Sequence, residues 1–239
     1  MQELFLKSEK KDFRTAEAFK MLRTNLEFSG EEIKVVAITS TIPGEGKSTV
    51  SFNLAETFAE AGKKVLLIDA DLRKSVMKTK VKKGKPRFGL THYLTGQNTL
   101  DEVLCKSDID NMYLCLAGPV PPNPSELLGG KRFTALIEAA KKAFDFIIID
   151  TPPIGSVVDA SVVAQHCDGV VVVVKSGLTS RRFAKRAQSS LKMANCKILG
   201  YVLNGIQIGK KNSYYGKYYG KYYGKYYGSY GEEAENEFD

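Results

Sequence analysis

The stretch that decides the fold of this chain is VVAITSTIPGEGKST, residues 35–49. An apolar run leads into a glycine-bearing turn, and a lysine, two hydroxyl residues and a helical pattern follow it. In such a turn, glycines let backbone N–H groups close around phosphates, the lysine reaches the β and γ oxygens, and the next hydroxyl can bind Mg²⁺. The stretch therefore predicts a cradle for a nucleoside triphosphate with magnesium, made by Pro43, Gly44, Glu45, Gly46, Lys47, Ser48 and Thr49.

Further along the chain, short apolar runs alternate with amphipathic stretches. Continuous runs of Val, Ile and Leu are typical of strands covered on both faces, as in a parallel sheet with helices on either side. We therefore predict an α/β fold, a doubly wound and mostly parallel sheet of the P-loop NTPase type. The predicted strands are residues 35–40, 65–69, 113–117, 146–150, 170–174 and 198–204, and the predicted helices are residues 48–61, 130–143, 158–166 and 180–195.

A leading helix is predicted over residues 14–28, before the first of these strands. Its apolar positions at helical spacing are Ala18, Leu22 and Leu26. A charged stripe lies beside them and consists of Glu17, Lys20 and Arg23. On its own, such a stripe indicates a solvated helix face.

Carboxylates follow two of the predicted strands. Asp69 and Asp71 end the strand in LLIDADLR, and Asp150 ends the strand in IIIDTPP. Because ligands of open α/β sheets bind at the carboxyl ends of the strands, these side chains are expected to meet at the phosphate cradle. Asp150 has the form of a Walker B residue, which holds magnesium directly or through water.

The composition indicates a protein with one hydrophobic core and argues against a zinc site, a disulfide framework and a membrane span. A chain of 239 residues with 43% hydrophobic content can bury one substantial core, and its net charge of +8 comes from basic residues that cluster in loops and in the tail. The four cysteines have no C-x-x-C spacing, which argues against a zinc site and a disulfide framework and favours reduced thiols. No run approaches the roughly 18 to 20 apolar residues that cross a bilayer, so we expect a cytoplasmic protein.

Past Asn204 the pattern becomes a four-residue repeat of the form YYGK, which an acidic terminus follows. Frequent glycine, dense charge and the absence of aliphatic residues from the repeat predict a disordered tail. The expected organisation is an N-terminal segment with a helix over residues 1–31, a P-loop domain over residues 32–207 and a disordered tyrosine-rich tail over residues 208–239. The tail tyrosines are Tyr214, Tyr215, Tyr218, Tyr219, Tyr222, Tyr223, Tyr226, Tyr227 and Tyr230.

The motifs PGEGKST, DxDxR and IIIDTPP together resemble the bacterial tyrosine kinases of capsule and exopolysaccharide systems, and the resemblance covers nearly the whole chain. The family's Walker A motif maps to residues 44–49, its Walker A′ motif to Asp69, Asp71 and Arg73, and its Walker B residue to Asp150. Its tyrosine cluster maps to the tail. The end of GYVLN resembles the strand end of related ATPases in which an asparagine, here Asn204, lies near adenine.

The resemblance implies an enzyme that transfers the γ-phosphoryl group of ATP to the tyrosines of its own tail and regulates polysaccharide polymerisation and export. Catalytic roles then go to Lys47, Asp69, Asp71, Arg73 and Asp150, and ATP and Mg²⁺ are the expected cofactors. Ser48, Asp71 and Asp150 would hold the metal, and Asp69 is our choice as the base. The sequence does not separate Asp69 from Asp71 in that role.

The resemblance also implies partners. The split Gram-positive type of this kinase is cytoplasmic, and a separate transmembrane activator, a polysaccharide co-polymerase, recruits it to the inner face of the membrane. A ring-shaped homo-oligomer and a cognate tyrosine phosphatase are expected, and nucleic acid is not. The family's subunit-contact motif ExxRxxR reads Glu17, Lys20 and Arg23 here, and lysine does not replace arginine in a bidentate pair.

Two other functions fit parts of the sequence. A partitioning-type P-loop ATPase usually has a second lysine five residues before the loop lysine, where this chain has Ile42. A nucleic-acid-binding module could use the aromatic and basic tail for stacking and charge. Residues 210–239 contain five lysines and five acidic residues, so their net charge is 5 − 5 = 0, which disfavours that second function.

Overall fold

The computed structural model describes residues 1–7 and 11–206. These residues form a nine-stranded sheet with the strand order β4-β1-β5-β6-β3-β7-β2-β8-β9. The strands are β1 (Gln2–Leu6), β2 (Val35–Ser40), β3 (Val65–Asp69), β4 (Val81–Lys83), β5 (Leu104–Ser107), β6 (Met112–Cys115), β7 (Phe146–Asp150), β8 (Gly169–Lys175) and β9 (Ile198–Asn204). The run from β6 to β9 is parallel throughout, whereas β5 pairs antiparallel with β6 and β4 pairs antiparallel with β1. The predicted doubly wound, mostly parallel α/β fold is confirmed.

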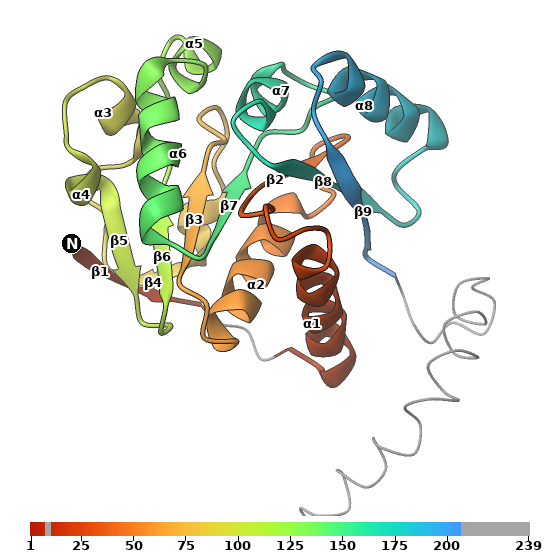
Figure 1. Cartoon of the computed structure of the whole chain (residues 1–239), viewed down its shortest axis with the longest axis horizontal. Helices are drawn as coiled ribbons and strands as arrows, with labels where there is room; N and C mark the ends of the chain where they lie inside the picture. The colour runs from red at the N-terminus through yellow and green to blue at the C-terminus, as the bar shows by residue number, and fades with distance from the viewer. Residues whose placement is uncertain (8–10, 207–239) are drawn as a thin grey trace, which may run out of the picture.

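Helices cover both faces of this sheet (Figure 1). One face carries α1 (Phe13–Glu27) and α2 (Lys47–Glu60). The other carries α3 (Leu90–Leu94), α4 (Leu100–Val103), α5 (Pro124–Leu128), α6 (Lys131–Ala143), α7 (Asp159–Ala164) and α8 (Arg181–Met193). A short 3₁₀ helix, η1 (Met77–Lys80), leads into β4.

Strand β2 shows why the central strands read as unbroken apolar runs. Val35 and Ala37 pack into the core beneath α3 to α8, while Val36 and Ile38 pack into the core beneath α1 and α2. All six β2 residues are buried. Because successive side chains point to opposite faces, a strand with helices on both sides needs apolar residues at consecutive positions.

Helix α1 follows the prediction in its position but differs in its buried stripe. Leu26 is buried, and Phe19 and Leu22 pack against the core beside it, whereas Ala18 is exposed. The predicted stripe of Ala18, Leu22 and Leu26 was therefore wrong at its first residue, because Phe19 and not Ala18 packs against the core. Both stripes fit helical spacing, and the larger apolar side chain is the one that the fold buries.

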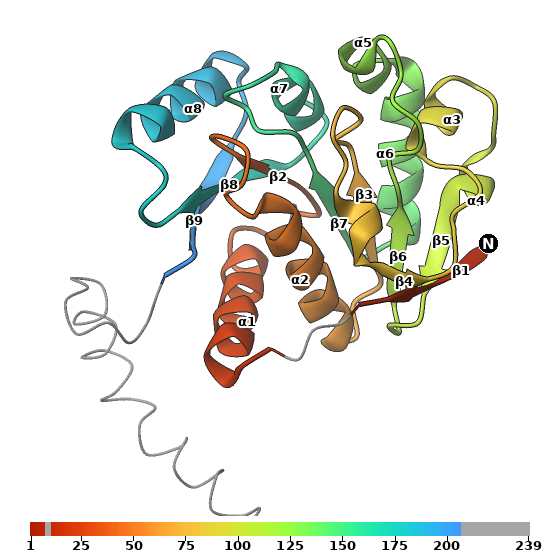
Figure 2. The same ribbon diagram turned by 180° about the vertical axis from the view of Figure 1, so that it is seen from behind.

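Strand β1 was not predicted. It lies inside the sheet between β4 and β5, and its register pairs Gln2 with Cys105 and Leu4 with Ser107 (Figure 2). The backbone N–H of Asp108 donates to the carbonyl of Leu4 at 3.0 Å, and Leu4 is fully buried. Strand β1 thus belongs to the same sheet as β2, the strand that leads into the phosphate cradle.

No helix within the described ranges is long and apolar enough to span a bilayer. The predicted tail over residues 208–239 and its nine tyrosines lie outside the residues that the structure describes.

Candidate active site

The phosphate cradle is the turn between β2 and α2. Gly44 and Gly46 adopt left-handed φ angles of 85° and 91°, which residues with a Cβ atom rarely take. A Cβ atom on Gly46 would also collide with the side-chain amide of Asn204. Helix α2 begins at Lys47, directly after Gly46, so its positive end lies at the turn where the sequence predicts phosphate binding.

Glu45 holds the turn from the inside. Its fully buried carboxylate accepts hydrogen bonds from the backbone N–H of Thr41 at 2.5 Å and the hydroxyl of Thr41 at 2.7 Å, and a third from the hydroxyl of Thr179. The side-chain amide of Asn204 donates to the Glu45 carbonyl at 2.9 Å. Glu45 was predicted to bind nucleotide, and this geometry leaves its backbone N–H, not its side chain, for that task.

Four predicted side chains meet at the start of α2. The ammonium of Lys47 lies 3.1 Å from an Asp71 oxygen and 3.4 Å from an Asp150 oxygen. The hydroxyl of Ser48 donates to the same Asp150 oxygen at 2.6 Å, and the hydroxyl of Ser51 donates to the other at 3.0 Å. Asp150 is almost fully buried, so these bonds fix its carboxylate at the end of β7.

Asp69 lies beside this cluster, because its backbone pairs with that of Asp150 across β3 and β7. Ser75 donates its hydroxyl to the Asp69 carboxylate. Burial first, and then the charge of Asp150, raise the pKa of Asp69 to about 7. Burial also raises the pKa of Asp150. Burial alone would lower the pKa of Lys47, but the charges of Asp150 and Asp71 outweigh it and raise that pKa.

The donor set fits a hard divalent cation. Asp69, Asp71 and Asp150 supply three buried carboxylates, and the ammonium of Lys47 pairs with two of them, those of Asp71 and Asp150. Mg²⁺ prefers a few carboxylate or hydroxyl oxygens together with phosphate and water oxygens. Among the described residues no group of three or more His, Cys, Asp or Glu side chains is arranged to hold a metal ion by itself.

Arg73 makes a different set of contacts. Its Nε donates to Asp159 at 2.7 Å and its Nη2 donates to the other Asp159 oxygen at 3.1 Å and to Ser125 at 3.3 Å. Asp159 is fully buried in the first turn of α7. The guanidinium therefore links the segment after β3 to α5 and α7. These hydrogen bonds go to Asp159 and Ser125 and not to the cluster around Lys47.

Comparison with known proteins assigns the family. A sequence family described as an AAA domain matches residues 33–192. Over 193 residues the chain is 46% identical to tyrosine-protein kinase CpsD of Streptococcus agalactiae, and the match covers 81% of this chain and 84% of that protein. The chain belongs to the bacterial tyrosine kinases.

Two further matches support the assignment. Tyrosine-protein kinase YwqD of Bacillus subtilis is 42% identical to this kinase over 201 residues, with 83% of this chain and 84% of that protein covered. The solved kinase domain of the Escherichia coli tyrosine kinase ETK has a TM-score of 0.77 at 35% identity, with 83% of this chain and 79% of that chain covered. The predicted protein-tyrosine kinase is confirmed, in preference to the partitioning-type ATPase, and the family implies nucleotide binding with a divalent metal.

The charged stripe of α1 is divided between two environments in this kinase. Lys20 pairs with Glu17 at 2.7 Å on the exposed side of the helix. Arg23 instead donates to the backbone carbonyl of Thr57 in α2 at 3.2 Å and is partly buried. The Glu17–Lys20 pair thus lies on the exposed side of α1, while Arg23 packs α1 against α2.

Several residues of the kinase site were missed by the sequence analysis. Ser51 lies four residues after Lys47, so helical spacing would have placed both on one face of α2. Ser75, Ser125, Asp159 and Thr179 have no such local signal, because each reaches the site through the tertiary fold.

Replacing Arg73 by Met is expected to destabilise the kinase by about 1–3 kcal/mol, because it leaves the buried Asp159 carboxylate without its charged partner. Burial alone would raise the pKa of Asp159, but the hydrogen bonds from Arg73 and Ser125 outweigh it and lower that pKa. The difference in free energy of unfolding between the variant and the unaltered chain should have its full size above about pH 3.9, the pKa of Asp159 in the unfolded chain. It should shrink as the pH falls through the lower pKa that Asp159 has in the folded chain. Urea unfolding at several pH values measures it.

Arg87→Met is the matched control, since Arg87 is exposed and contacts the Phe88 ring. It should change the free energy of unfolding by less than about 1 kcal/mol. Equal stability of the Arg73 variant and this control would refute the role of Arg73 in holding α7.

Proposed function

We propose that this kinase transfers the γ-phosphoryl group of ATP to tyrosine hydroxyls of its own 208–239 segment, with Mg²⁺ as the metal. The cluster of Lys47, Ser48, Asp71 and Asp150 at the carboxyl ends of β3 and β7 is the observation that carries the proposal. It supplies one cation and oxygen donors next to a turn whose glycines take the conformations that phosphate loops require.

The chain's own groups have separate tasks in this reaction. Backbone N–H groups of the turn and the ammonium of Lys47 would stabilise charge on the β and γ oxygens. Ser48, Asp71 and Asp150 would hold the Mg²⁺, which neutralises phosphate charge when it is bound. The tyrosine oxygen attacks the γ phosphorus as the bond to the ADP oxygen breaks, and that oxygen keeps the bonding electrons.

Asp69 is the proposed base for the tyrosine proton. Its pKa of about 7 lies near the operating pH, where a carboxylate can accept a proton efficiently. The hydroxyl of Ser75 orients its carboxylate, while the carboxylates of Asp71 and Asp150 are occupied by Lys47 and Ser48. This distribution of contacts favours Asp69 over Asp71 as the base.

The last strand before the acceptor segment ends at this site. The amide of Asn204, the last residue of β9, contacts the phosphate turn, and Tyr214 follows ten residues later. Ten extended residues reach at most about 33–36 Å, so the first tyrosines are tethered within a short distance of an active site. Intact mass spectrometry after incubation with MgATP tests the proposal, since stepwise mass increases should appear in the full chain and be absent when the tail is deleted after Lys210.

Transfer is expected to occur between subunits of a ring or other closed oligomer to which Glu17, Lys20 and Arg23 contribute. A Lys47→Met chain with an intact tail should gain phosphate when it is mixed with an active chain whose tail is deleted after Lys210. The activator should be present if the kinase needs one. A mixture in which the tail-deleted chain also carries Lys47→Met is the control, and an unphosphorylated inactive chain in the active mixture would contradict transfer between subunits.

We further propose that a separate transmembrane activator brings the kinase to the inner face of the membrane and that a cognate phosphatase reverses its phosphorylation. The kinase would then regulate polymerisation and export of a capsular polysaccharide or exopolysaccharide. Among the described residues no membrane-crossing helix is found, so recruitment through another chain is consistent with this fold. Membrane fractionation with and without the co-expressed activator tests recruitment.

A further inference from the structure

Helix α8 carries a cluster of four cationic side chains that have no role in the proposed kinase reaction. Arg181, Arg182, Lys185 and Arg186 occupy its first two turns, and all four are exposed. None of them forms an ion pair with another residue in the ranges 1–7 and 11–206. We refer to these four residues as the basic face of α8.

The basic face is unfavourable for the helix itself. Arg181 and Lys185, and likewise Arg182 and Arg186, are like charges four residues apart, which destabilises a helix. The first turn contains no acidic residue, although the positive end of the helix dipole favours acids there. A bound anion would offset both effects, so this arrangement indicates an anionic ligand more than a structural role.

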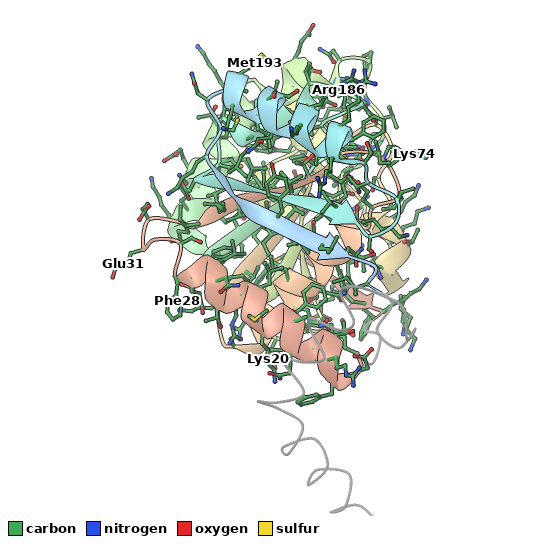
Figure 3. The ribbon with its side chains drawn as sticks, turned by 90° about the vertical axis from the view of Figure 1, so that its right-hand side faces the viewer. Lys20, Phe28, Glu31, Lys74, Arg186 and Met193 are labelled. Atoms are coloured by element: carbon green, nitrogen blue, oxygen red, sulfur yellow. The ribbon has the colours of Figure 1, made fainter. Side chains whose placement is uncertain are left out.

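A hollow of about 760 Å³ lies against the basic face. Its other wall contains Thr41, Ile154 and Gly155, and its volume is within the range of about 300–1,000 Å³ that is usual for ligand sites. None of the phosphate-turn residues 43–49 and none of the three site aspartates lines it. Figure 3 shows Arg186 on α8 and Lys20 on α1 on opposite sides of β9, so the hollow is also separate from the charged stripe of α1.

The described part of the chain ends at the same edge of the sheet as the start of α8. The backbone N–H of Ser176 donates to the carbonyl of Asn204 at 2.9 Å, and α8 begins five residues after Ser176. The end of β9 and the start of α8 therefore lie at the same edge of the sheet. Tyr214 follows Asn204 by ten residues, which span at most about 33–36 Å when fully extended. The segment 210–239 has a net charge of 5 − 5 = 0, and each phosphotyrosine adds about −1.5 to −2.

We propose that the basic face of α8 and its hollow bind phosphotyrosines of the segment 214–230, from the same chain or from a second copy. The inference rests on the proposed function, because the segment acquires the matching charge only after phosphorylation. Arginine pairs with phosphate through two parallel hydrogen bonds, and α8 offers three arginines. Binding there would hold the phosphorylated product away from the active site and leave that site open to the next tyrosine.

The test uses the full chain without nucleotide and a labelled synthetic peptide of residues 213–230 with phosphotyrosine at positions 215, 219 and 223. Fluorescence anisotropy should show binding at least about tenfold tighter than for the unphosphorylated peptide. Arg182→Gln with Arg186→Gln should weaken phosphopeptide binding by about tenfold or more. Because the peptide is made chemically, this result does not depend on the chain's own kinase activity, so the two proposals can fail separately.

The charge-matched control is Lys82→Gln with Lys85→Gln, an exposed lysine of β4 and another just after it. It should weaken binding less than about twofold. An equal loss in this control, or equal binding of the two peptides, would overturn the proposal. Circular dichroism checks the fold of each variant, and Arg182→Lys with Arg186→Lys, which keeps the charge but loses bidentate contacts, should give an intermediate loss.

Vesicles containing phosphatidylserine provide the last comparison. If the unaltered chain binds them at the same salt concentration, loses that binding in the Arg182→Gln, Arg186→Gln variant and does not discriminate the two peptides, the basic face contacts a membrane and the proposal is wrong.

Discussion

Replacing Lys47 by Met is expected to lower tail phosphorylation by at least about 10³-fold, which corresponds to roughly 4 kcal/mol of transition-state stabilisation. Lys47 is the one cation in contact with Asp71 and Asp150, and no other described lysine or arginine pairs with either carboxylate. Methionine has a similar apolar stem, so it should fill the space of the lysine chain without supplying its charge. Intact mass spectrometry after incubation with MgATP, with any required activator present, gives the number of phosphates per chain.

Lys63→Met is the control for this experiment, because Lys63 is exposed just after α2 and forms no ion pair within the described residues. It should keep the phosphorylation rate within about twofold. The Lys47 variant should still unfold cooperatively, since the apolar cores on both faces of the sheet are untouched. Undiminished phosphorylation in a folded Lys47→Met chain would show that the reaction takes place elsewhere.

Replacing Asp150 by Asn is expected to lower the rate by about 10²–10³-fold, or roughly 3–4 kcal/mol. The amide keeps the shape of the carboxylate and one oxygen acceptor for Ser48 or Ser51, but it removes the charge that faces Lys47 and a metal. The concentration of Mg²⁺ needed for half-maximal rate should rise as well. A magnesium titration of the initial rate measures both effects.

Asp110→Asn is a conservative control for the Asp150 change, because Asp110 is exposed in the turn before β6. It should leave the rate and the magnesium requirement unchanged. A large loss of rate in the Asp150 variant with an unchanged magnesium requirement would assign Asp150 to positioning Lys47 and not to the metal.

The centre of the fold was predictable because its signals are local. Strands β2, β3 and β7 are continuous apolar runs, and the glycines of the phosphate turn immediately follow β2. The carboxyl ends of neighbouring parallel strands necessarily meet, so the proximity of Asp69 to Asp150 follows once the sheet is recognised. The sheet margin was less predictable, since β4 has only three residues and β1 depends on β5, which comes much later in the chain.

Side-chain direction was the part of the site that sequence could not supply. Glu45 stands inside a phosphate-binding motif, but the bonds to Thr41 and Thr179 turn its carboxylate inward. Thr179 reaches Glu45 only because β8 lies beside β2. Arg73 and Asp159 are likewise separated by 86 positions, and no spacing rule connects them. Motifs identify which residues gather at a site, whereas tertiary contacts decide which of their atoms face the ligand.

Strand β1 is synthesised well before β5, the strand with which it pairs in parallel. Leu4 pairs with Ser107, and a ribosome adds about 5–20 residues per second, so roughly 5–20 s separate the synthesis of the two strands. During that interval the apolar Leu4 and Leu6 and an unpaired strand edge are exposed to other nascent chains. We expect the exposed strand β1 to be a site of chaperone binding in the nascent kinase during this interval.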